Sequence, residues 1–80
     1  MDGQSTQDRV RAAIVRALGL TSPAPNFPLR MGSTPGWDSL GHMTVVMELE
    51  REFGVRVPVT RISDLVDVDA IVRAIAAGMK

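Results

Sequence analysis

The hydrophobic positions of the chain form three helix-like segments, separated by regions in which that pattern breaks. In the first segment the apolar positions recur three and four residues apart, on one face of a helix: Val10, Ala13, Ile14, Ala17 and Leu18. Ser5 precedes this segment with Asp8 three residues later, in a variant of the capping box, and Gly19 follows its end. The pattern predicts a helix from Ser5 to Gly19.

The region 20–37 follows neither a helical nor a strand period and is rich in Pro, Gly, Ser and Thr. Its prolines exclude a regular helix. Connections of this length in a small domain are usually functional or packed by their own side chains. We therefore expect an ordered crossover that Phe27 and Leu29 attach to the core.

A second helix is predicted from Asp38 or Ser39 to about Phe53, with Gly54 closing it. Its main apolar stripe is continuous: Val45, Val46, Leu49 and Phe53. A second apolar line runs along an adjacent face: Leu40, Met43 and Met47. A helix in so small a domain rarely buries both faces, so the second line is a candidate contact surface.

The last third of the chain predicts a short helical turn over 60–66, with Ile62 and Leu65 inward, and then a helix capped by Asp67. The buried stripe of that helix is Val68, Ile71, Val72, Ile75 and Met79. Val55, Val57 and Val59 alternate briefly, but Pro58 among them argues against a strand. The predicted fold class is all-α: a small antiparallel bundle of three main helices plus a short helical turn, with a long ordered loop between the first two helices, in one domain over 1–80.

Composition narrows the function classes. A chain of 80 residues is short for an enzyme with a cleft, and it holds no Cys and one His, which excludes disulfides and Cys- or His-rich metal clusters. A formal net charge of zero disfavours a nucleic-acid partner. No signal-peptide pattern and no apolar stretch of about 20 residues are present, so we expect no membrane span and a cytoplasmic location.

One segment carries a motif: Gly36-Trp37-Asp38-Ser39-Leu40-Gly41-His42-Met43 resembles the Asp-Ser-Leu attachment motif of acyl carrier proteins. The resemblance extends over roughly 27–75, through the acidic end of the second helix, the Val57-Pro58 step and the later apolar positions. Asp-Ser alone is a common capping pair at a helix start. Its place at a loop-to-helix junction, with the downstream spacing intact, makes the signal specific.

The resemblance implies a non-catalytic acyl carrier. Ser39 matches the position whose hydroxyl receives 4′-phosphopantetheine from coenzyme A through a phosphopantetheinyl transferase, and the thiol of that arm holds acyl groups as thioesters. Asp38 matches the carboxylate that helps to engage the transferase and its metal. Unpaired N–H groups and the macrodipole at a helix start favour the phosphodiester. Further implied partners are an acyltransferase, a ketosynthase or an adenylating ligase, met by a monomeric carrier.

The residues expected to recognise partners surround Ser39 or follow it along the second helix: Trp37, Asp38, Leu40, His42, Met43, Met47, Glu48 and Glu50. Methionine side chains suit surfaces that adapt to several partners. Trp37 fits a loop anchor better than a ligand platform. His42 is either a polar contact or a base for Ser39, but a hydrolase is disfavoured because so small a chain offers no oxyanion hole.

The charge pattern departs from that of the fatty-acid carriers in the family that the chain resembles. Those carriers are typically strongly acidic, with carboxylates along the second helix. Gly41, Thr44 and Arg51 stand where those carriers tend to place acidic residues. This difference favours a carrier of polyketide or other specialised metabolism. The alternatives are an aminoacyl or peptidyl carrier, a fatty-acid carrier and, from another class, a helical protein–protein interaction domain without a prosthetic group.

Overall fold

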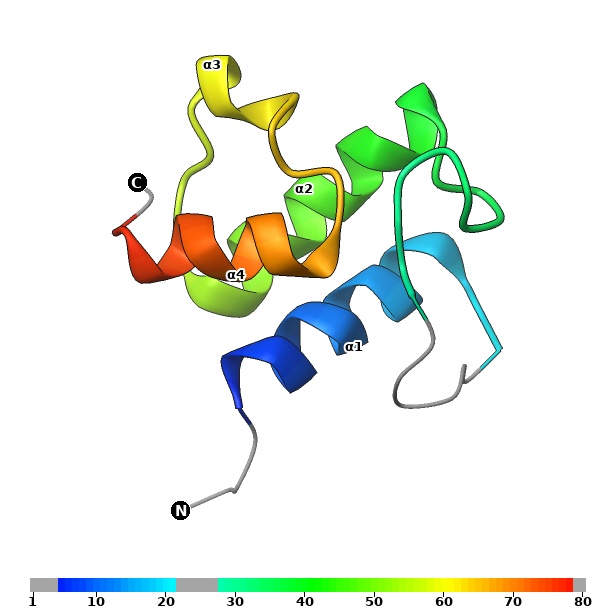
Figure 1. Cartoon of the computed structure of the whole chain (residues 1–80), viewed down its shortest axis with the longest axis horizontal. Helices are drawn as coiled ribbons and strands as arrows, with labels where there is room; N and C mark the ends of the chain where they lie inside the picture. The colour runs from blue at the N-terminus through cyan, green and yellow to red at the C-terminus, as the bar shows by residue number, and fades with distance from the viewer. Residues whose placement is uncertain (1–4, 22–27, 79–80) are drawn as a thin grey trace.

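The computed structural model describes residues 5–21 and 28–78. Four helices follow one another: α1 (Thr6–Leu18), α2 (Ser39–Phe53), α3 (Val59–Ile62) and α4 (Val68–Ala76). Figure 1 shows α1 and α2 running in opposite directions, with α4 also antiparallel to α1. Within the described ranges the only extended pairing is an isolated antiparallel bridge between Arg30 and Asp67. The all-α prediction is confirmed.

The three main helices start where their capping residues predict, and α1 and α2 also end there. The side chain of Ser5 accepts a hydrogen bond from the Asp8 amide at 3.1 Å, and the Asp67 carboxylate accepts one from the Ala70 amide at 2.8 Å. Such bonds satisfy amides that have no partner inside the helix. Gly19 and Gly54 adopt φ values of 64° and 63° and close α1 and α2 in the left-handed conformation.

The core lies where α1 meets α2 and α4. Its largest fully buried side chains come from all three helices and from the segments between them: Trp37, Ile14, Leu49, Leu65, Ile71, Val10 and Val45. Phe53, Val72 and Ile75 are only partly buried at its edge. Met79, expected in the same stripe as Ile75, lies outside the described residues.

The crossover is attached to the core by Leu29, which is 2% exposed, as predicted. Phe27, the other expected anchor, lies outside the described residues. Beyond Leu29 the Met31 amide donates to the Val66 carbonyl at 2.8 Å, so the crossover pairs with the segment that leads into α4. Residues 28–37 of the crossover are therefore held by both apolar and backbone contacts.

The predicted turn over 60–66 begins and ends earlier than expected. α3 starts at Val59, directly after Pro58, whose φ of −62° suits a helix start, and it ends at Ile62. The chain then turns through Ser63 and Asp64 and buries Leu65 completely. The helix stops because Leu65 and Val66 are drawn back to the core and the crossover, a tertiary constraint that local pattern does not show.

Candidate functional site

The predicted attachment motif lies at the N-terminal end of α2. Ser39 is the first residue of the helix and is exposed. Asp38 adopts an extended conformation before it, and its Oδ1 accepts a hydrogen bond from the Gly41 amide at 2.8 Å. Asp38 is therefore the N-cap of α2, while the Ser39 side chain makes none of the hydrogen bonds found in the described structure.

The turn that leads to Ser39 is closed by its own hydrogen bonds. The buried Thr34 hydroxyl accepts from the Arg30 amide at 2.7 Å, and the Thr34 amide donates back to the Arg30 carbonyl at 2.9 Å. The Gly32 amide donates to the Trp37 carbonyl at 2.9 Å, and the Trp37 amide donates to the Thr34 carbonyl at 3.0 Å. Ser39 is thus presented by a compact turn with a defined backbone.

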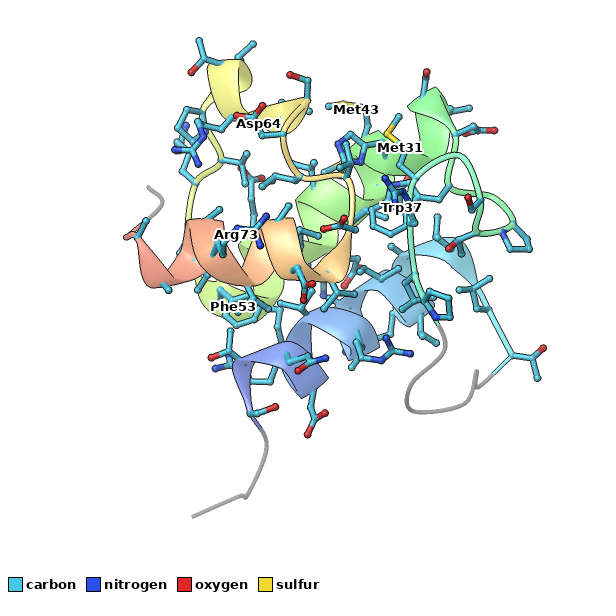
Figure 2. All side chains as sticks on the ribbon, viewed as in Figure 1. Met31, Trp37, Met43, Phe53, Asp64 and Arg73 are labelled. Carbon is cyan, nitrogen blue, oxygen red and sulfur yellow. The ribbon has the colours of Figure 1, made fainter. Side chains whose placement is uncertain are left out.

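Trp37 and His42 are buried, which corrects their expected role as partner-facing side chains. Trp37 is 1% exposed and His42 4% exposed. Figure 2 shows Trp37 beneath the crossover, directed into the body of the molecule. The two side chains leave almost no surface for an enzyme to contact, because they fill the space under the turn before Ser39. The alternative that Trp37 anchors the loop agrees with its burial.

His42 is also not a base for Ser39. Its Nδ1 accepts a hydrogen bond from Trp37 Nε1 at 2.8 Å, and its Nε2 lies 2.7 Å from the Ile62 carbonyl oxygen. A general base needs a free nitrogen within reach of the hydroxyl. Both ring nitrogens of His42 are bonded elsewhere, so no nucleophile–base pair forms.

The second apolar line of α2 is exposed beside Ser39. Leu40 is 82% exposed, Met43 46% and Met47 60%, as a contact surface requires. Val59 at the start of α3, which sequence reasoning did not single out, is 84% exposed. Figure 2 places Met43 on the side of the molecule where α3 lies. An enzyme that approaches Ser39 meets apolar side chains.

The carboxylates of α2 already have partners within the chain. Glu48 bonds to Arg16 of α1 and to Arg51, each at 3.4 Å, and its side chain is 21% exposed. Glu50 Oε2 accepts from the Val57 amide at 2.8 Å. Glu48 and Glu50, expected to recognise partners, are thus also used within the chain, by α1 and by the segment after α2.

Glu52 is the centre of the ionic contacts between α1 and α2. Its carboxylate bonds to Arg9 at 2.9 Å and to Arg16 at 3.0 Å, and its backbone carbonyl also accepts from Arg9. The hydrogen bond from Arg9, with a further contribution from Arg16, holds the pKa of Glu52 below its ordinary value. The Arg9 guanidinium also lies 4.5 Å from the centre of the Phe53 ring.

The chain matches the family described as phosphopantetheine attachment site over residues 8–75. It belongs to this family of carrier proteins, whose domains are not catalytic and bear a covalent 4′-phosphopantetheine group. Such carriers interact with modifying and acyl-processing enzymes. No solved structure gave a significant match to the chain. The expectation of an acyl carrier is confirmed at the level of the family.

The residues at the head of α2 fit covalent attachment of this group. An exposed hydroxyl occupies the first position of the helix, and the start of a helix favours a negatively charged group such as a phosphate. Within the described residues, no cluster of three or more metal-ligating side chains occurs, and no helix is long and apolar enough to cross a membrane.

Proposed function

We propose that Ser39 carries the 4′-phosphopantetheine arm and that the chain presents acyl groups, bound to the arm as thioesters, to partner enzymes. The observation that carries this proposal is an exposed serine at the first position of α2, within the span that matches the family. Other described serines differ in setting: Ser5 caps α1, and Ser33 and Ser63 lie in turns outside any helix.

Ser39 acts in this proposal as a substrate of a phosphopantetheinyl transferase. Its Oγ forms a bond to the phosphorus of coenzyme A that bears pantetheine, the phosphoanhydride bond breaks, and adenosine 3′,5′-bisphosphate leaves. The hydroxyl proton passes to a base of the transferase, because both nitrogens of His42 are already bonded. Asp38 caps the helix with Oδ1 and keeps its second oxygen for the transferase or its metal.

The partner-facing surface in this proposal consists of Leu40, Met43 and Met47. Leu40 follows Ser39 directly, and Met43 and Met47 lie one and two helical turns farther along. An enzyme whose active site reaches the end of the arm, whether an acyltransferase, a ketosynthase or an adenylating ligase, covers this part of α2. Exposed apolar side chains at such a place favour binding when a partner removes them from water.

The engaged carboxylates favour a carrier of specialised metabolism, such as a polyketide pathway, over a fatty-acid carrier. An acidic second helix serves a fatty-acid carrier by attracting basic patches on its enzymes. In this chain Glu48 and Glu52 are neutralised by Arg9, Arg16 and Arg51. An aminoacyl or peptidyl carrier is the second candidate, since the same apolar face and arm suit it. The single domain over 1–80, the monomeric state and the cytoplasmic location stay predictions.

The experiment that tests the proposal is incubation of the apo protein with coenzyme A, Mg²⁺ and a broad-specificity transferase, followed by intact mass spectrometry. We expect a gain of one phosphopantetheine for the wild type and none for Ser39→Ala, while Ser33→Ala should gain it normally. No gain in the wild type, under conditions that load a control carrier, would overturn the proposal. Efficient elongation of the loaded protein by fatty acid synthase enzymes alone would contradict the assignment to specialised metabolism.

A further inference from the structure

Two buried aromatic side chains bracket Ser39, one on each side in sequence. Trp37 belongs to the turn before the serine and His42 to the first turns of α2. Their rings are stacked, with centroids 6.0 Å apart and an angle of 24° between the planes. Neither side chain is accessible to an enzyme, so any effect they have on Ser39 acts through its position.

The hydrogen bonds of this pair define one protonation form of His42. An indole N–H is a donor only, so His42 Nδ1, at 2.8 Å from Trp37 Nε1, must be an acceptor without a proton. The neutral ring then carries its proton on Nε2 and donates it to the Ile62 carbonyl at 2.7 Å. The chain of bonds therefore has one direction, from Trp37 through His42 to Ile62.

This chain of bonds connects α2 to α3. Ile62 is the last residue of α3, and its carbonyl accepts from the Leu65 amide at 3.3 Å as well as from His42 at 2.7 Å. α3 has no fully buried residue and no side-chain cap at its start. Ile62 packs partly buried against the core, but the other side chains of this one-turn helix add little apolar contact, so its position also depends on its hydrogen bonds. The bond from His42 is therefore one of the ties between α3 and the rest of the domain.

We propose that His42 is a positioning residue that holds the Ser39 turn, the head of α2 and the end of α3 in one register, so that an enzyme acting at Ser39 meets α2 and α3 in a fixed relative position. The proposal rests on the assignment of the arm to Ser39. Its physical basis is that one imidazole bonds the turn through Nδ1 and α3 through Nε2. Loss of the Nε2 bond uncouples α3 from the head of α2, and loss of the Nδ1 bond uncouples the Ser39 turn from it, while Ser39 keeps its hydroxyl in both cases.

Three variants separate these effects. His42→Leu removes both hydrogen bonds and keeps an apolar side chain, whereas His42→Gln offers a carbonyl and an amide that can replace them. Trp37→Phe keeps an aromatic ring and removes only the indole donor. Urea denaturation first establishes the conditions under which each variant is fully folded, and all other measurements are made there.

In the apo protein, long-range ¹⁵N–¹H correlation spectra should show His42 with its proton on Nε2, and amide exchange in α3 should be faster in His42→Leu but not in His42→Gln. In loading by the transferase, His42→Leu should raise the KM for the carrier roughly five- to tenfold, the effect of a typical net hydrogen bond, with kcat unchanged. His42→Gln should restore KM to near the wild-type value.

The inference is overturned if α3 exchange and the KM of His42→Leu equal those of the wild type, or if the Nδ1 tautomer is observed. If His42→Leu does not fold, Trp37→Phe tests the inference instead. It should raise the KM for the carrier and speed amide exchange in α3, both to a smaller degree than expected for His42→Leu. Failure of the wild type to be loaded at all would instead refute the assignment of Ser39. The tautomer and the α3 exchange would still test the positioning role in that case.

Discussion

Gly41 in the first turn of α2 lies against the carbonyl oxygen of Gly36, so closely that a Cβ at Gly41 would overlap that oxygen. The same Cβ would also lie 3.2 Å from Leu18 Cδ2 at the end of α1. Gly36 has a φ of 83° and brings its backbone onto the helix there. The absence of a side chain at Gly41 therefore lets the turn before Ser39 pack against the helix after it.

Gly41→Ala should destabilise the domain. At an ordinary interior position of a helix the same change stabilises by about 1 kcal/mol, but here the methyl group meets backbone that cannot move as a flexible side chain would. We expect a loss of about 1–3 kcal/mol, typical of overpacking, measured by urea denaturation. Thr44→Ala, at an exposed position of the same helix, is the control and should be neutral or stabilising. A stabilised Gly41→Ala protein would show that the turn does not pack as described.

Leu40 should matter to partners and not to the fold. Because Leu40 is 82% exposed, Leu40→Ser should change stability by less than about 0.5 kcal/mol. Loss of an apolar contact at the centre of an interface costs more than about 1 kcal/mol, so the transferase KM for the carrier should rise at least about fivefold. The measurement is the rate of loading against carrier concentration.

Glu48→Gln is the matched comparison for Leu40→Ser. Since the Glu48 carboxylate is bonded to Arg16 and Arg51, its neutralisation should affect loading less than Leu40→Ser does. For the same reason loading of the wild type should depend only weakly on added salt, which screens exposed charges. If Glu48→Gln impaired loading more than Leu40→Ser, partners would recognise charge on α2 and the apolar surface would be secondary.

The lowered pKa of Glu52 predicts a dependence of stability on pH. A carboxylate bonded to Arg9 and Arg16 takes up its proton at lower pH in the folded chain than in the unfolded chain, whose carboxyl pKa is about 4.3. Its stabilising contribution is therefore complete above that value and is lost as the pH falls through the lower folded pKa. The urea concentration at the unfolding midpoint should therefore decrease as the pH is lowered from the unfolded pKa through the folded pKa of Glu52.

Glu52→Gln should make that acid loss shallower, because an amide does not titrate. Arg9→Gln should flatten it more than Arg16→Gln does, since the Arg9 hydrogen bond is the larger cause of the lowered pKa. Identical acid profiles for the wild type and Glu52→Gln would show that the ionic contacts between α1 and α2 do not hold the carboxylate in its charged form.

Local signals were sufficient to predict the three main helices. Ser5, Asp38 and Asp67 each precede an apolar period and cap a helix, and Gly19 and Gly54 end two of them. α3 was misplaced by local reasoning, because its end depends on the burial of Leu65 and on the pairing of Val66 with the crossover. Contacts between segments distant in sequence decide such a boundary, and periodicity carries no information about them.

In the candidate site, too, some features follow from the local sequence and others depend on contacts between distant segments. The exposed positions of Ser39 and Leu40 follow from the helix start and the second apolar line. The burial of Trp37 and His42 does not, because it arises when the turn folds over the helix. The contact of Glu48 with Arg16 of α1 does not follow either, since nothing in the second helix alone shows that Arg16 reaches it. A glycine at position 41, inside a predicted helix, is the sequence signal for the close contact with Gly36, but from the sequence alone we interpret it only as a position that lacks an acidic side chain.

The central claim, that Ser39 carries the arm, is tested most directly by locating the modification in the loaded wild-type protein. The holo-protein is cleaved with protease and its peptides are fragmented in the mass spectrometer. We predict that the phosphopantetheine mass, and the fragment lost when the arm is ejected, map to Ser39 alone, with Ser33 and Ser63 unmodified. An arm on another residue, or a fully loaded protein whose Ser39 is unmodified, would contradict the account.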